Sequence, residues 1–130
     1  MPDANTGRRG YFNDPKGDWP YEDFFFKELM PYVERKYRIK SDKKFRAVAG
    51  LSMGGGGRFI YALHYPESFS SVCPLSAVTG LLSVEEAKTS LSRTNPSIAD
   101  TAVVSYYNHY SVLAVVNNMS DVQKNQSGGI

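Results

Sequence analysis

The chain has 130 residues, of which 42% are hydrophobic, and carries a formal net charge of +2 at pH 7. This length suits one domain and this composition can build a core, so we expect neither a multidomain protein nor a disordered one. Acidic and basic residues are mixed along the chain and no run of 18 apolar residues occurs. We therefore expect no nucleic-acid partner and no membrane span.

The sequence begins with a loop and continues with a helix. Residues 1–20 are rich in Gly, Asn, Asp and Pro and contain no complete helix or strand pattern. Residues 21–37 then place an apolar stripe at helical spacing. The stripe consists of Phe25, Leu29, Val33 and Tyr37. Pro31 should kink this helix, because proline has no backbone N–H to donate.

A strand-to-helix motif follows, and it is the most informative stretch of the sequence. The apolar run after the charged turn SDKK predicts a buried strand over 45–50 in a parallel sheet. Residues 50–54 are Gly-Leu-Ser-Met-Gly, which fits G-x-S-x-G, the nucleophile elbow. Ser52 should therefore lie in a strained turn that projects its Oγ clear of the sheet edge. A helix over 54–65 should follow this turn.

Two further expectations come from the demands of such an elbow. The strand and the helix would pass so close together that Gly50 and Gly54 tolerate almost no side chain. The start of the helix would direct backbone N–H groups, that of Met53 first, at an oxyanion. The four consecutive glycines leave two alternatives open, a phosphate-binding loop and a structural turn. The Lys-Ser/Thr pair of a P-loop is absent, which weakens the first alternative.

A second strand completes a βαβ unit. Residues 70–76 predict a strand parallel to the first, with Phe69 and Val72 turned into the core. The single cysteine, Cys73, excludes an intramolecular disulfide and a zinc cluster, and we expect it to be a small buried side chain. The sequence predicts no metal site.

After residue 77 the sequence takes on the character of an insert. The run SVEE, residues 83–86, is a capping box that predicts a short helix to about Leu91. Residues 102–116 are apolar and tyrosine-rich, helical or mixed, and a polar tail follows. We therefore expect the core portion of a domain over 1–77 and a lid-like segment over 78–130.

Residues 47–77, AVAGLSMGGGGRFIYALHYPESFSSVCPLSA, resemble the core of the putative esterase family of α/β-hydrolases. The GLSMGG elbow, the helix ending in YPESF and the strand ending in Ser-Ala carry this resemblance. YEDFFFKELMPYVERKY is similar to the stretch that precedes the elbow strand in the family. Feruloyl and acetyl-xylan esterases, S-formylglutathione hydrolases and mycolyltransferases belong to it. The likeness is greatest to feruloyl-esterase-like members linked to plant cell-wall polysaccharides, which insert a region similar to YYNHYSVLAVVNNM.

The resemblance implies a partial α/β-hydrolase fold, with a doubly wound, mainly parallel sheet and a helical lid-like insert. It implies a serine carboxylester hydrolase of feruloyl or acetyl groups. Its substrate would be an ester-bearing carbohydrate or a small acyl ester, its intermediate an acyl-enzyme at Ser52, and it would need no cofactor. The alternatives are an acyltransferase of the same family and a catalytically incomplete chain that self-associates as a homo-oligomer through open sheet edges. The resemblance also implies a secreted or periplasmic protein, although the polar start MPDANTGRRG predicts no signal peptide in this chain.

The resemblance further implies that the triad acid and histidine follow on later strands, so we expect an internal fragment that lacks both. His64 lies twelve residues along the predicted helix from Ser52, about 18 Å away, and cannot reach its Oγ. His109 follows Asp100 in the chain order that such a triad requires, but the eight residues between them must supply both a strand end and a loop. His109 is therefore the alternative general base, with a lid or structural role as the competing interpretation.

Three aromatic residues in the first loop are candidates for substrate binding. Tyr11, Phe12 and Trp19 could line a cleft that accepts an aromatic acyl group, because binding residues are often carried on loops. The competing interpretation is that these side chains pack onto their own domain.

Overall fold

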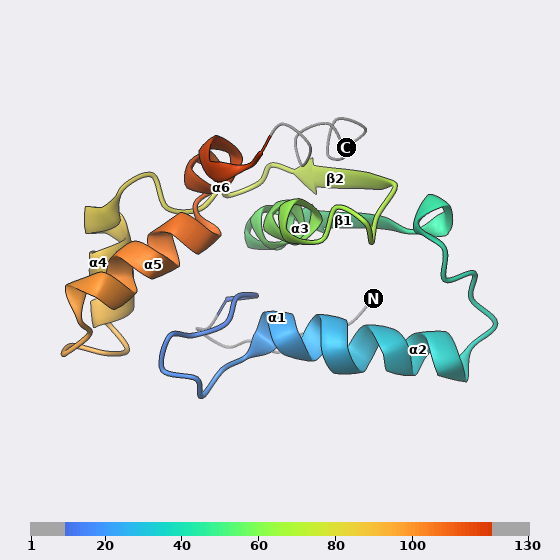
Figure 1. The fold of residues 1–130 in the computed structure, drawn as a ribbon, viewed down its shortest axis with the longest axis horizontal. Coiled ribbons are helices and arrows are strands. Elements are labelled where there is room, and N and C mark those ends of the chain that lie inside the picture. Colours follow the sequence, from blue (N-terminus) through green and yellow to red (C-terminus); the bar gives the residue numbers. More distant parts are fainter. Residues whose placement is uncertain (1–9, 121–130) are drawn as a thin grey trace.

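The computed structural model describes residues 10–120, shown in Figure 1. The elements are α1 (Tyr21–Phe24), the π-helical turn η1 (Phe25–Leu29), α2 (Met30–Lys36), the 3₁₀ turn η2 (Lys43–Phe45), β1 (Ala47–Leu51), α3 (Met53–His64), β2 (Ser71–Leu75), α4 (Val84–Ser92), α5 (Asp100–Tyr110) and α6 (Val112–Asn118). Within the described range, none of the helices combines the length and apolar composition that a membrane span needs.

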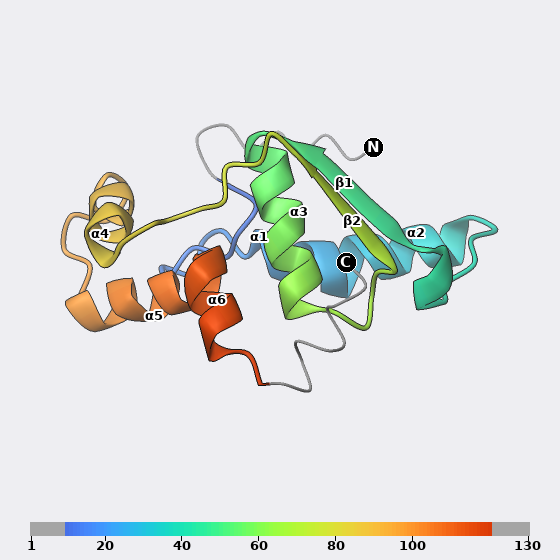
Figure 2. The ribbon, with the colours of Figure 1, turned by 90° about the horizontal axis from the view of Figure 1, so that it is seen from above.

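The two strands and the helix between them form the expected parallel βαβ unit. β1 pairs with β2 in a parallel register that runs from Ala47 opposite Ser71 to Leu51 opposite Leu75. α3 connects them, because parallel neighbours need a crossover that returns the chain to the starting edge. The carboxyl ends of both strands therefore lie together, beside the start of α3 (Figure 2).

Residues 21–36 form one continuous helical stretch whose regularity is broken just before Pro31. The turn at Phe25–Leu29 is π-helical, and α2 begins immediately after it with Pro31 in its first turn. The disturbance expected from the missing proline N–H thus takes the form of a widened turn. The predicted stripe is wrong at its last position, because Tyr37 is extended and 58% exposed, beyond the end of the helix.

The main core lies between α3, the sheet and the helix over 21–36. Val48 of β1 packs with Tyr61 and Ala62 of α3 and with Phe69, and Val72 of β2 contacts the same cluster. The inward orientation of Phe69 and Val72 is therefore confirmed. The helix over 21–36 contributes Phe25, Phe26 and Met30 to this cluster.

The opposite face of the sheet carries exposed side chains. Burial alternates along both strands, and the outward positions, such as Leu51 and Leu75, are 68% and 54% exposed. Cys73 lies on this face and is exposed, so the expectation of a buried cysteine is wrong. Its neighbours are apolar, but among the described residues the helices pack on the other side of β2. In a fully doubly wound sheet both faces are covered.

The segment after β2 is helical. Ser83 caps α4 by accepting a hydrogen bond from the Glu86 N–H at 3.2 Å, as the capping box predicts, while the Glu86 carboxylate accepts the Leu82 N–H at 2.9 Å. α4 and α5 share a small core, and α5 and α6 pack against the C-terminal half of α3 through Tyr110. Figures 1 and 2 show α4 and α5 at one end of the molecule and α6 between α5 and α3.

Candidate active site

Ser52 has the backbone conformation that the elbow motif demands. It lies between the end of β1 and the start of α3, with φ of 54° and ψ of −119°. A positive φ is uncommon for a residue with a side chain and stores on the order of 1–3 kcal/mol of strain, which persists only where the surroundings enforce it. The Ser52 side chain is exposed, and its Oγ forms no hydrogen bond to the helix that it precedes.

Three backbone hydrogen bonds enforce this strained turn. The Ser52 N–H donates to the Leu75 carbonyl at the end of β2, at 2.9 Å. The Ser52 carbonyl accepts two N–H groups, from Gly56 and from Val78, each at 3.1 Å. These hydrogen bonds therefore hold the elbow both to the end of β2 and to the segment that follows β2.

The glycines after Ser52 matter for a different reason than the motif suggests. A Cβ on Gly50 would lie 2.3 Å from the Gly54 carbonyl oxygen, so the predicted crowding at Gly50 is confirmed. A Cβ on Gly54 would meet nothing closer than 3.8 Å, so the predicted crowding at Gly54 is wrong. The tight positions are Gly55 and Gly56. An added Cβ would lie 2.9 Å from the Gly50 carbonyl oxygen at Gly55 and 1.8 Å from the Val78 carbonyl oxygen at Gly56. Gly55 is tight because it lies against the carboxyl ends of β1 and β2, where the Leu75 carbonyl oxygen is 3.0 Å away, and Gly56 is tight because the chain leaving β2 crosses over the first turn of α3.

The start of α3 offers unbonded N–H groups beside Ser52. Met53 is the first residue of this 12-residue helix, so its N–H has no hydrogen-bond acceptor within the helix. The positive end of the helix dipole lies at the same place. These features fit an oxyanion donor at Met53, which stays a prediction.

The histidines lie at the other end of α3. His64 is its last residue, and the rise of the helix separates it from Ser52 by about 18 Å. His109 stacks on His64 with ring centroids 4.2 Å apart, so it lies at the same distant end. The alternative prediction that His109 is the general base for Ser52 is therefore wrong, because α5 ends against the C-terminal turn of α3. These two are the only histidines of the sequence, so this chain holds no histidine placed to deprotonate Ser52.

The three loop aromatics pack onto their own domain, and one of them lies beside the elbow. Phe12 stacks on Tyr110 with centroids 4.4 Å apart and contacts both main clusters of the core. The Trp19 indole N–H donates to the Gly10 carbonyl at 2.9 Å. Tyr11 covers Gly57 in the first half of α3, and its hydroxyl is the nearest side-chain atom to Gly54. Of the three, Tyr11 is the candidate to contact a substrate at Ser52.

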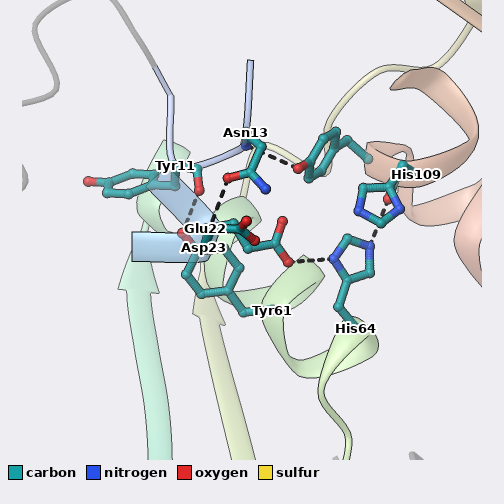
Figure 3. Close-up of polar contacts among 8 residues, drawn as sticks. Tyr11, Asn13, Glu22, Asp23, Tyr61, His64 and His109 are labelled. Atoms are coloured by element: carbon teal, nitrogen blue, oxygen red, sulfur yellow. Dashed lines mark hydrogen bonds and ion pairs between the residues drawn. The ribbon is translucent and has the colours of Figure 1, made fainter. Parts of the chain in front are cut away.

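Sequence reasoning missed a cluster of polar groups formed by Glu22, His64 and His109. His64 Nδ1 lies 2.6 Å from Glu22 Oε1, and its Nε2 lies 2.8 Å from the His109 carbonyl oxygen (Figure 3). Glu22 is only 2% exposed. Partial burial of the His109 ring, and then the neighbouring His64, lower the pKa of His109. These residues are 42 and 45 positions apart, so only the packing of three helices brings them together.

Comparison with known proteins connects this geometry to a family. The family model described as "Putative esterase" matches residues 3–125. An esterase of Mycobacterium tuberculosis (strain ATCC 25618 / H37Rv) is 35% identical over 85 residues, which are 62% of this chain and 18% of that protein. An endo-1,4-beta-xylanase/feruloyl esterase of Xylanibacter ruminicola is 41% identical over 49 residues, 38% of this chain and 7% of that protein.

Among solved structures, a ferulic acid esterase superposes on this chain with a TM-score of 0.68 and 31% sequence identity. The superposition covers 94% of this chain and 42% of that one. The chain thus spans less than half of the matched structure, and less than a fifth of each of the two relatives just described.

Proposed function

The chain belongs to the putative esterase family, and from this membership we propose that it carries the nucleophile of a serine carboxylesterase, Ser52. The observation that carries the proposal is the Ser52 backbone, held at a φ of 54° between a parallel strand and a helix. A strained, exposed serine directly between the end of a strand and the first residue of a helix is what a nucleophile elbow requires.

The proposed reaction uses an acyl-enzyme. Ser52 Oγ attacks the ester carbonyl carbon while a base removes its proton, and the Met53 N–H stabilises the oxyanion of the tetrahedral intermediate. Collapse of that intermediate expels the alcohol, which takes up the proton, and leaves the acyl group on Ser52. Water then releases the acid and regenerates the serine. The base must come from outside this chain, because both of its histidines lie at the far end of α3; we propose that the acid that orients this base also lies there.

The proposed substrate is an ester of a plant cell-wall polysaccharide, with a feruloyl or acetyl group as the acyl part. The names of two similar proteins, a ferulic acid esterase and an endo-1,4-beta-xylanase/feruloyl esterase, support this choice. Tyr11, beside the first turns of α3, is the residue we expect to contact the acyl group or its alcohol.

Serine substitution tests the proposal in a protein that combines these residues with a triad histidine and acid. Ser52→Ala should leave the fold intact and lower kcat for methyl ferulate by about 10⁴-fold or more, the scale for losing a triad nucleophile. Ser76→Ala is the matched control, because Ser76 is also exposed and also has a positive φ, of 41°. Wild-type activity in Ser52→Ala would exclude Ser52 as the nucleophile.

A second candidate function rests on the uncovered face of the sheet. The exposed Leu51 and Leu75, next to Cys73, would let a catalytically incomplete chain self-associate. The same esterase assay separates the two candidates, since a non-catalytic chain shows no Ser52-dependent turnover even beside a complete histidine and acid.

A further inference from the structure

Three potential metal ligands from three helices meet at the C-terminal end of α3. They are Glu22 of α1, His64 of α3 and His109 of α5, and one ligand atom of each lies within 4.8 Å of those of the others. Figure 3 shows the Glu22 carboxylate and the His64 ring directed at each other, with the His109 ring beside them. We infer that these side chains form a binding site for one divalent transition metal ion of the Zn²⁺ class.

The hydrogen bonds of His64 define which of its nitrogens faces the ion. Nε2 lies 2.8 Å from the His109 carbonyl oxygen, which only accepts, so Nε2 carries a proton and donates it. In a neutral ring Nδ1 then has a lone pair, and this lone pair faces Glu22 Oε1 at 2.6 Å. Only a cation between them, a proton or a metal ion, makes that contact favourable. Metal-binding histidines commonly donate their second N–H to a backbone carbonyl in this way.

The second carboxylate oxygen of Glu22 favours a metal ion over a proton. Glu22 is only 2% exposed, and its Oε2 is buried without a hydrogen-bond partner. The Tyr110 hydroxyl, whose oxygen accepts the Asn13 N–H, approaches the same carboxylate and keeps its own proton to donate, but it forms no hydrogen bond to Oε2 in this arrangement. A buried carboxylate oxygen without a partner is costly. A proton on His64 satisfies Oε1 alone, whereas a metal ion can be bound by both oxygens.

Small movements would suffice to seat such an ion. Zn²⁺ binds imidazole nitrogen at about 2.0–2.1 Å and carboxylate oxygen at about 2.0–2.2 Å in a tetrahedral arrangement, so the 2.6 Å contact must open to about 3.4 Å. The His109 ring must tilt out of its stack on His64 to direct a nitrogen at the ion. A cavity of about 390 Å³, lined by these residues together with Asn13 and Asn108, leaves room for that movement and for a water ligand.

The location of the site predicts a structural role. It lies at the end of α3 opposite Ser52, about 18 Å away by the helix rise, and its ligands come from the helix before the sheet, the crossover helix and the segment after the sheet. An ion there would hold α1, α3 and α5 together. Because the unfolded chain does not assemble these ligands, the ion would bind the folded form and stabilise it.

The test is titration of ZnCl₂ into the full chain by isothermal calorimetry, without a histidine tag and with Cys73→Ser, because the exposed thiol could itself bind zinc. One ion should bind per chain, and Zn²⁺ at a hundred times its Kd should raise Tm by roughly 10 °C. His109→Phe keeps a stacking ring but removes its nitrogens. It should weaken binding by more than about 100-fold, beyond the effect of losing an outer-shell partner.

Two further variants keep the inference falsifiable. Glu22→Gln should abolish binding in a chain whose circular dichroism still shows it folded, and Glu67→Gln, which removes an exposed carboxylate just beyond α3, should bind like the parent. No binding by the folded parent, or equal binding by His109→Phe, would overturn the inference. The first of these results would leave Glu22 and His64 as a proton-bridged pair only.

Discussion

The close crossing of the chain over the elbow gives a sharp prediction at Gly56. An alanine Cβ there would lie 1.8 Å from the Val78 carbonyl oxygen, and ordinary van der Waals contact begins near 3.4 Å. The backbone at Val78 must therefore move by about 1.6 Å. It cannot do so freely, because the Val78 N–H is bonded to the Ser52 carbonyl at 3.1 Å.

The cost of Gly56→Ala combines three contributions. Overpacking costs about 1–3 kcal/mol, and losing the hydrogen bond from Val78 to Ser52 costs about 1 kcal/mol. Alanine recovers about 1 kcal/mol of helix propensity over glycine. We expect the free energy of unfolding to fall by about 2 kcal/mol. Gly54→Ala is the matched control in the same helix, where the new Cβ meets nothing within 3.8 Å, so it should be neutral or slightly stabilising.

Urea unfolding of the three proteins at one chain concentration, followed by far-ultraviolet circular dichroism, measures the difference. The midpoint for Gly56→Ala should lie clearly below those of the parent and of Gly54→Ala. Equal midpoints for the two variants would show that the segment after β2 does not cross α3 this closely, and would refute the steric account of the glycine run.

Three further predictions concern the cap, the cysteine and the sheet face. Ser83→Ala removes the acceptor of the Glu86 N–H and should lower the free energy of unfolding by about 1 kcal/mol, measured by the same urea titration; no change would show that the cap contributes nothing. At a chain concentration low enough to keep the protein monomeric, Cys73 should react with a thiol reagent in the native chain about as fast as in the unfolded chain, and protection there would mean that the chain itself covers this face of the sheet. The 130-residue chain should self-associate in sedimentation, and Leu75→Lys on the exposed face should reduce that association. The unmodified 130-residue chain should also hydrolyse p-nitrophenyl acetate no faster than its Ser52→Ala variant. A monomer with Ser52-dependent turnover would contradict the assignment of the base to residues outside this chain.

The βαβ unit and the elbow could be predicted from the sequence, because both depend on local patterns. The strand-turn-helix around Ser52 follows from an apolar run, a glycine-rich turn and helical spacing, and the Ser83 cap is equally local. Cys73 could not be placed correctly, since its burial depends on whether another layer covers the sheet. Gly54 was misjudged because the motif records spacing, whereas the crowding comes from a distant segment.

The site at the end of α3 could not be predicted for a related reason. The separation of His109 from Ser52 and its stacking on His64 both depend on how α5 docks against α3, and no local pattern encodes that. The polarity of Glu22 and His64 gave no warning either, because each residue alone suits an exposed helix end.

The most direct test of the central claim is covalent labelling of the nucleophile. A fluorophosphonate should be added to a protein that contains these residues with a complete histidine and acid, and the modified peptide identified by mass spectrometry. The account predicts a single phosphonyl group on Ser52, absent in Ser52→Ala and retained in Ser76→Ala. A label on another residue, or feruloyl esterase activity that survives in Ser52→Ala, would contradict it.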